Sequence, residues 1–210
     1  MEKAIFISLE GGEGVGKSTQ IAFITEWFKK HNLPLTTTFE PGGTELGQEV
    51  RKILKHAEYD ITPRAELLLF NACRAELMEE VIKPAISNNI SILSDRFCDS
   101  TFVYQSYGRG LDFNKTYNIT QFAVDDVFPY FTFWLDLPPK EAFARKNGAD
   151  NDRFEQTGLD FHNKVYEAYK DLSKKFPNRI KRIDASKSVE EVSAQIEQYL
   201  NEYFFENNPV

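Results

Sequence analysis

The chain has 210 residues, and its 25 Lys and Arg residues against 32 Asp and Glu residues give a formal net charge of −7. This length and a hydrophobic content of 41% predict one globular domain over residues 1–210 and exclude a disordered or fibrous chain. The negative charge argues against a surface that coats nucleic acid and against docking on an anionic membrane, so neither partner is expected.

The cysteine content and the apolar runs favour a cytoplasmic protein. The sequence contains only Cys73 and Cys98, which lack the spacing of a disulfide scaffold or a metal site. The apolar run 4–9 is too short for the core of a signal peptide, and no run reaches the roughly 20 residues of a membrane-spanning helix. A reducing, cytoplasmic location is therefore expected.

Strand and helix patterns alternate along the chain. The predicted strands cover residues 4–9, 35–39, 90–94, 131–137 and 179–184. The predicted helices cover residues 17–30, 44–55 and 62–81, with a further helix near the C-terminus. Thr62 and Pro63 are typical of a helix start, as a hydroxyl N-cap followed by proline in the first turn, and Pro84 should end that helix.

This alternation predicts an α/β fold with a five-stranded parallel sheet flanked by helices on both faces. The C-terminal helix should face the core, because Val189, Val192, Ile196 and Leu200 lie on one stripe. The polar segment 147–157 interrupts the pattern between two helical stretches. That segment is either a solvated loop or a mobile lid.

A glycine-rich motif lies between the first strand and the first helix. Residues 11–18 match GxxxxGK[ST], the phosphate-binding P-loop, in the strand–loop–helix context that this motif requires. Its backbone N–H groups surround phosphate oxygens, Lys17 reaches the β- and γ-phosphates, and the Ser18 hydroxyl binds Mg²⁺. The expected ATP-binding residues are Gly11, Gly12, Glu13, Gly14, Val15, Gly16, Lys17, Ser18 and Thr19.

An acidic residue and a basic residue follow the predicted strand 90–94. Asp95 occupies the place of a Walker-B carboxylate, which holds Mg²⁺ directly or through water, although a strand-ending Asp is as often only a helix cap. Arg96 beside it favours a ligand site, because open α/β sheets bind ligands at the carboxyl ends of their strands. The pair would put one group on the metal and the other on an incoming phosphate.

Four further segments resemble the thymidylate kinase family, P-loop kinases that phosphorylate dTMP to dTDP. They are FEPGGT at 39–44 with Arg51 after it, LLFNACR at 68–74, DRFCDSTFVYQ at 95–105 and DRFE at 152–155. They follow the order and spacing of the family from about residue 5 to residue 170. The resemblance implies the three-layer fold of P-loop NTPases, ATP as donor, dTMP as acceptor and Mg²⁺ as cofactor. It also implies a homodimer, which the helices between residues 62 and 130 could form.

The resemblance assigns several residues to the thymine base and its sugar. Phe70 and Arg74 share one helix face, so a ring can stack on the base while a guanidinium group reaches a carbonyl oxygen. By the same resemblance Thr101 reads the pyrimidine edge and Tyr104 lies beneath the deoxyribose, leaving no room for a 2′-hydroxyl. Gln105 belongs to the same motif and is expected to bind substrate.

Other matching residues belong to the phosphates. The resemblance places Arg51 and Arg96 on the acceptor monophosphate, a dianion suited to guanidinium groups, and Glu13 near the sugar and phosphate of the acceptor. It also suggests a cis peptide bond between Glu40 and Pro41.

The catalytic arginines are expected in a lid over residues 145–157. The P-loop carries Val15 where one branch of the family has a catalytic arginine, so this chain resembles the branch that supplies arginines from the lid. Phe39 replaces a family arginine, which removes a phosphate role at that position. The expected catalytic residues are Lys17, Asp95, Arg96, Arg145 and Arg153, with Lys146 as a weaker candidate.

Two alternatives stay open from the sequence. The first is another nucleotide or deoxynucleoside kinase, such as one that accepts UMP or CMP. The second is a P-loop regulatory ATPase without an acceptor substrate. A guanine-nucleotide switch is not expected, because the chain lacks an NKxD motif and a DxxG motif.

Overall fold

Five strands form one parallel sheet in the order β2-β3-β1-β4-β5. The computed structural model describes residues 4–145 and 158–206. The strands are β1 (Phe6–Glu10), β2 (Leu35–Phe39), β3 (Ser91–Asp95), β4 (Phe131–Asp136) and β5 (Ile180–Asp184). The predicted five-stranded parallel sheet is therefore confirmed, and each strand begins and ends within two residues of its predicted bounds.

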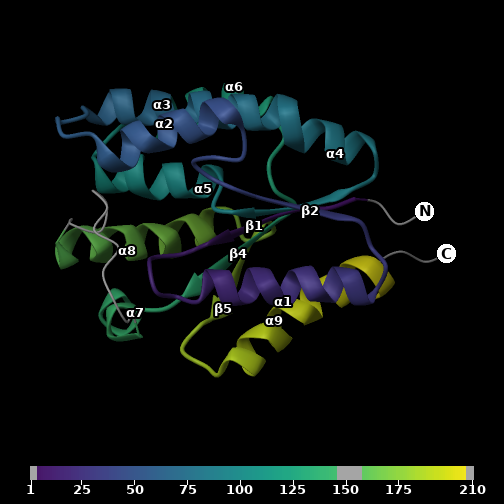
Figure 1. The fold of residues 1–210 in the computed structure, drawn as a ribbon. Coiled ribbons are helices and arrows are strands. Elements are labelled where there is room, and N and C mark those ends of the chain that lie inside the picture. Colours follow the sequence, from purple (N-terminus) through teal and green to yellow (C-terminus); the bar gives the residue numbers. More distant parts are fainter. Residues whose placement is uncertain (1–3, 146–157, 207–210) are drawn as a thin grey trace.

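Helices cover both faces of the sheet, as predicted (Figure 1). The helices that begin before β4 are α1 (Lys17–Lys30), α2 (Glu45–His56), α3 (Pro63–Leu77), η1 (Met78–Ile82), α4 (Lys83–Ser87), α5 (Cys98–Thr101), η2 (Phe102–Gly108) and α6 (Phe113–Val124). Those after it are α7 (Pro139–Arg145), α8 (Leu159–Lys175), α9 (Val189–Asn201) and η3 (Glu202–Glu206). The segments η1, η2 and η3 are π-helical.

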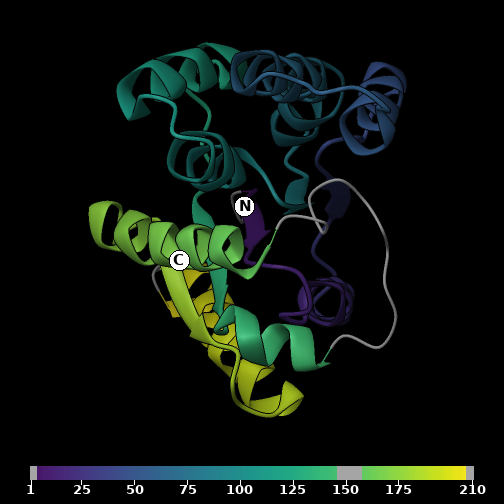
Figure 2. The same ribbon diagram turned by 90° about the vertical axis from the view of Figure 1, so that its left-hand side faces the viewer.

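The two faces of the sheet carry separate apolar cores. Successive side chains of a strand point to opposite faces. Ile7 and Leu9 of β1 therefore pack with α1 and α9, whereas Phe6 packs with α5, η2 and α8 on the other face. Figure 2, turned by 90°, shows α8 between α7 and the α5–η2 segment. Because both faces are buried, β1 and β4 read as almost continuous apolar runs.

The long helix predicted over residues 62–81 begins as expected, with Thr62 as N-cap and Pro63 in the first turn, but it differs from the structure at its C-terminal end. Its C-terminal part continues through Pro84 as η1 and α4, because the π turn changes the hydrogen-bond register just before the proline. Pro84 then lies in the first turn of α4, where its missing N–H costs little. At the other end the Thr62 hydroxyl makes no capping hydrogen bond, and only its carbonyl oxygen accepts from the backbone N–H of Glu66 at 2.9 Å.

The C-terminal helix α9 faces the core, as predicted, through Val192, Ile196 and Leu200. Val189, which the stripe also included, is 52% exposed because it lies in the first turn, at the edge of the contact. Among the described residues, no helix combines the length and the apolar character needed to cross a bilayer.

Candidate active site

The P-loop joins the carboxyl end of β1 to the N-terminus of α1. Gly14 and Gly16 have φ angles of 75° and 99°, in the left-handed region that favours glycine. A Cβ atom on Gly14 would also lie 2.5 Å from the carbonyl oxygen of Ala142. Lys17 Nζ donates to the carbonyl oxygens of Gly12 and Gly11 at 2.7 and 3.4 Å. Burial, followed by the charge of a nearby arginine, lowers the pKa of Lys17 to about 8, so a bound anion would favour its charged form.

A cleft of about 930 Å³ extends from the P-loop to α3 and η2. This volume is within the range of small-molecule sites. Most of the residues predicted from the sequence line it, namely Glu13, Gly14, Gly16, Lys17, Ser18, Thr19, Arg51, Phe70, Arg74, Asp95, Arg96, Thr101, Tyr104 and Gln105. Segments that are far apart in the sequence therefore meet around one space.

The remaining predicted residues lie elsewhere. Gly11 and Gly12 form the base of the loop, and Val15 packs into the core on the α1 side of the sheet. Arg145 ends α7 and donates to the carbonyl oxygens of Ala185 and Ser186 at 2.8 and 3.3 Å, between β5 and α9. Arg145 is thus not among the cleft residues. Arg153, Lys146 and the rest of the expected lid lie outside the described residues.

At the α3 end of the cleft, Arg74 forms a buried ion pair with Glu40. Arg74 Nη2 lies 2.6 Å from Glu40 Oε2, and Nε lies 3.0 Å from both carboxylate oxygens. The two side chains are 1% and 4% exposed. Burial raises the pKa of Glu40, and the guanidinium group of Arg74 opposes that change. Sequence reasoning missed this pairing, although the resemblance correctly implied that the Glu40–Pro41 bond is cis.

The contacts of Arg74 leave one of its five N–H groups for a ligand. Besides Glu40, Nη2 donates to Thr101 Oγ1 at 3.0 Å and Nη1 donates to Asn71 Oδ1 at 3.2 Å. The guanidinium carbon lies 5.3 Å from the centre of the Phe97 ring. One Nη1 hydrogen therefore remains without an acceptor in the described residues, beside Phe70 in the lining of the cleft.

Gln105 is held by a second buried carboxylate, Glu66. Gln105 Nε2 donates to Glu66 Oε1 at 2.8 Å, and Arg109 donates to both oxygens of Glu66 at 3.3 and 3.4 Å. Glu66 is fully buried and Gln105 is 1% exposed. Because the amide nitrogen faces Glu66, the amide oxygen of Gln105 is the group available to the cleft as an acceptor.

Basic side chains gather between the P-loop and β3. Arg96 Nη2 lies 2.8 Å from Glu13 Oε1, and its guanidinium carbon is 5.3 Å from the centre of the Tyr104 ring. Arg51 donates to the carbonyl oxygen of Pro41 at 2.8 Å. The structure thus brings the predicted phosphate ligands together with the predicted sugar contact.

Asp95 and Ser18 fit a magnesium ion. Asp95 Oδ1 is buried and accepts no hydrogen bond from any residue in the described ranges. It lines the same cleft as the Ser18 hydroxyl. Mg²⁺ prefers oxygen ligands and is often held by one or two protein groups together with substrate phosphates. Within residues 4–145 and 158–206 no cluster of three acidic, His or Cys side chains offers another metal site.

Sequence reasoning also missed Glu10, the last residue of β1. Its side chain is fully buried and accepts from the backbone N–H groups of Phe97 and Ser100 and from the hydroxyl groups of Ser100 and Tyr169. The only available signal was an acidic residue at the end of an apolar strand, directly before the P-loop.

We expect Glu10 to make stability depend on pH. Burial, and next Asp99, raises the pKa of Glu10 from 4.5 to about 7, while Arg96, Ser100 and Tyr169 oppose the change. The folded state therefore binds this proton more tightly than the unfolded state, and the stabilisation is lost as the pH rises through about 7. At about 1.4 kcal/mol per pH unit, the unfolding free energy of the wild type should fall by about 3 kcal/mol relative to Glu10→Gln between pH 4.5 and pH 8. Urea unfolding at several pH values measures this difference, and a constant difference would contradict the expectation.

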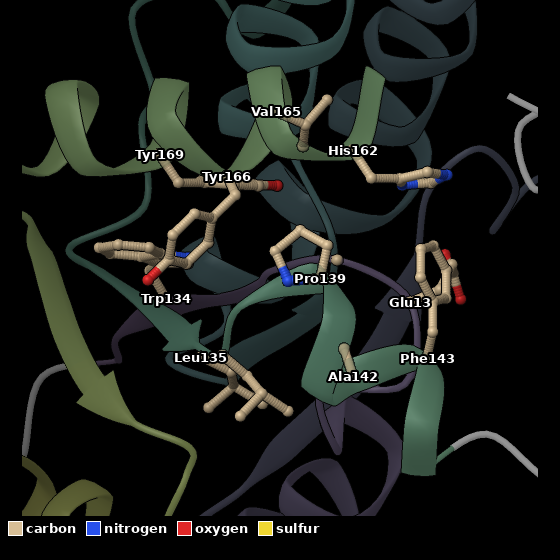
Figure 3. A pocket seen from close by; sticks show the side chains of 12 residues that line it. Glu13, Trp134, Leu135, Pro139, Ala142, Phe143, His162, Val165, Tyr166 and Tyr169 are labelled. Atoms are coloured by element: carbon tan, nitrogen blue, oxygen red, sulfur yellow. The ribbon is translucent and has the colours of Figure 1, made fainter. Parts of the chain in front are cut away.

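A second cavity, of only about 20 Å³, lies between the P-loop, α7 and α8 (Figure 3). Its walls include Glu13, Pro139 and Phe143, together with Tyr166 and Tyr169 of α8. This space is large enough for about one water molecule and far too small for a nucleotide. The large cleft is therefore the candidate active site.

Comparisons with known proteins agree with this geometry. The sequence model of the thymidylate kinase family matches residues 9–196. The chain is 41% identical over 206 residues to the thymidylate kinase of Gloeobacter violaceus, covering 97% of both chains. It is 41% identical over 214 residues to that of Chlorobium luteolum, covering 97% of this chain and all of the relative. The crystal structure of thymidylate kinase from Ehrlichia chaffeensis superimposes with a TM-score of 0.75 at 30% identity, covering 94% of this chain and 99% of that one. The chain therefore belongs to the thymidylate kinase family.

Proposed function

We propose that the large cleft binds dTMP beside the ATP phosphates and carries the transfer of the γ-phosphoryl group that yields dTDP and ADP. As a member of its family, the protein is a dTMP kinase that uses ATP. The observation that supports a shared site is the continuity of the cleft. One space joins Lys17 of the P-loop to Phe70 and Arg74 on α3.

The polar groups at the α3 end match thymine in their hydrogen-bonding sense. Thymine offers a carbonyl acceptor at C4 and an N–H donor at N3. The remaining N–H of Arg74 and the amide oxygen of Gln105 have the complementary polarity. Cytosine reverses both groups, since it carries an amino group at C4 and an unprotonated N3. It would therefore leave buried groups of the protein unpaired, which costs binding free energy.

At the P-loop end, the protein supplies positive charge for two sets of phosphates. We propose that Lys17 and the loop N–H groups hold the phosphates of ATP, and that Arg51 and Arg96 hold the acceptor phosphate. An acceptor oxygen would then attack the γ-phosphate in line, without a covalent intermediate on the enzyme. Ser18 and Asp95 would hold Mg²⁺, which supplies charge neutralisation of the phosphates when bound.

Arg145 and Arg153 are proposed as stabilisers of transition-state charge. Arg145 donates hydrogen bonds to the carbonyl oxygens of Ala185 and Ser186. It would have to leave these acceptors to reach the transferring phosphoryl group. Separate substitution of the two arginines, with turnover and dTMP affinity both measured, identifies which residue acts on the chemical step.

We also propose a homodimer formed through α3 and α6. These two helices pack against each other and expose Leu68 and Phe122, which are 56% and 88% accessible. Such exposure of large apolar side chains is typical of interaction surfaces when the residues are contiguous. Light scattering should find two chains per particle, and Phe122→Asp should shift the population toward monomers. A wild-type monomer at micromolar concentration would contradict the proposal.

A panel of nucleoside monophosphates tests the substrate assignment. With ATP and Mg²⁺ present, ADP formation should be fastest with dTMP, slower with dUMP and at least about 10²-fold lower in kcat/KM with dCMP, because the reversed polarity of cytosine costs several kcal/mol. A preference for UMP or CMP would indicate a different nucleotide kinase. A rate of ADP formation that is the same with and without a nucleoside monophosphate would indicate a P-loop ATPase.

A further inference from the structure

We propose that Glu10 is a positioning residue that holds Arg96 in place for the acceptor phosphate, with Tyr169 supporting it from α8. The inference rests on the proposed function in one respect, the assignment of Arg96 to that phosphate. Glu10 is not itself among the residues that line the cleft, but it accepts hydrogen bonds from Ser100, which is. Its effect on the reaction would therefore pass through the residues that it binds.

Arg96 has a backbone conformation that the surroundings must maintain. Its φ angle is 66°, in the left-handed region where a residue other than glycine is strained. The backbone N–H of Arg96 donates to the carbonyl oxygen of Leu9 at 2.9 Å, and the Ser94 hydroxyl donates to the carbonyl oxygen of Arg96 at 2.6 Å. The following N–H, that of Phe97, donates to Glu10 Oε1 at 2.8 Å. Glu10 is thus the side chain that fixes the exit of the strained turn.

The same carboxylate also supports the side chain of Arg96. The hydroxyl group of Ser100 donates to Glu10 Oε2 at 2.6 Å and accepts from Arg96 Nη1 at 3.2 Å. The backbone N–H of Ser100 donates to Glu10 Oε1 at 3.2 Å. Glu10 therefore controls both the backbone turn and, through one hydroxyl group, the direction of the guanidinium group.

Tyr169 extends this arrangement to α8. Its hydroxyl group donates to Glu10 Oε2 at 2.7 Å, and its ring stacks on Trp134 with centres 5.9 Å apart. The residue is 1% exposed, so the hydrogen bond is shielded from water. Figure 3 shows Tyr169 and its neighbour Tyr166 among the α8 side chains that face α7 and the P-loop. A displacement of α8 would therefore reach Arg96 through Glu10.

The position of Glu10 in β1 explains why this carboxylate reaches α5 and α8. Alternate residues of a strand point to the same face, so Glu10 points with Phe6 and Ser8 away from the core that Ile7 and Leu9 share with α1. The pairing of Leu9 with Asp95 places the end of β1 next to the Arg96 turn.

Calorimetric titration with dTMP and with thymidine separates this role from a general structural one. Thymidine lacks the phosphate, so displacement of Arg96 should weaken the binding of dTMP but not the binding of thymidine. We expect Glu10→Gln to raise the Kd of dTMP about tenfold and Tyr169→Phe to raise it about threefold. The Kd of thymidine should change less than twofold in both variants. Tyr166→Phe, the same substitution one turn away on α8, should leave both affinities unchanged. In an Arg96→Ala background, the effect of Tyr169→Phe should disappear.

The alternative outcomes are distinct. Equal weakening of dTMP and thymidine, or no change in either, overturns the positioning role of Glu10. If Glu10→Gln fails to fold, Tyr169→Phe decides by the same criterion, since it removes only one hydroxyl group. If Arg96→Ala itself leaves the dTMP-to-thymidine ratio unchanged, the phosphate role of Arg96 in the proposed function fails, and the inference about Glu10 fails with it.

Discussion

Replacing Lys17 with Met should reduce phosphoryl transfer by about 10³-fold or more while the protein stays folded. Lys17 Nζ lies against the carbonyl oxygens of Gly11 and Gly12 in the P-loop, and the lysine of this motif is the one expected to reach the β- and γ-phosphates. In a loose transition state, catalysis consists mainly of positioning and charge stabilisation, so removal of this charge cannot be compensated by a nucleophile. Met retains most of the apolar length of the side chain. The measurement is ADP formation with saturating dTMP.

Lys29→Met provides the matched control for this substitution. Lys29 lies on the same helix, α1, but its side chain is exposed and pairs with Glu26, three residues away. Such a surface ion pair contributes little to stability. The control should keep wild-type turnover, and both variants should show wild-type circular dichroism. Turnover of Lys17→Met within tenfold of the wild type would contradict the assigned role of the P-loop lysine.

The parts of the site that the sequence predicts are those whose signal is local. The P-loop lies within eight consecutive residues between a strand and a helix, and Phe70 and Arg74 are one helical turn apart. Such spacings fix which side chains share a face, whatever the rest of the chain does. The helix limits near Pro84 were wrong because a π turn shifted the register, which residue types alone do not reveal.

The buried carboxylates could not be predicted in the same way. Glu40 and Arg74 are 34 residues apart, Glu66 and Gln105 are 39 apart, and Glu10 and Tyr169 are 159 apart. Each acidic residue is typical of an exposed surface position when its sequence neighbours alone are considered. Only the fold shows that these three carboxylates hold Arg74, Gln105 and the Arg96 turn, residues that line the cleft or lie next to its lining. The sequence therefore indicates the groups that meet ligand, while their supports require the structure.

Replacing Arg74 with Met should cost about 3–5 kcal/mol of unfolding free energy and abolish measurable dTMP binding. The substitution leaves the Glu40 carboxylate buried without its cation, and loss of one partner of a buried pair has a cost of this size. It also removes the donor proposed for the C4 carbonyl of thymine. Glu40→Gln in the same chain should restore part of the stability, because a neutral amide has a smaller desolvation cost, but it should not restore dTMP binding.

Arg182→Met is the control for the stability measurement. Its partner Asp136 is also buried, at 3% exposure, but the Arg182 side chain is 66% exposed, so water can replace the guanidinium group. Its loss should therefore cost about 1 kcal/mol or less of unfolding free energy.

The stability deficit of Arg74→Met should also depend on pH. Burial raises the pKa of Glu40, and in this variant the opposing cation is gone. Protonation of Glu40 should therefore reduce the deficit of Arg74→Met as the pH falls. Urea unfolding of the wild type and these three variants at pH 5 and pH 8 tests these expectations. A deficit for Arg74→Met no larger than that of Arg182→Met at both pH values would show that the Glu40–Arg74 pair does not behave as a desolvated ion pair.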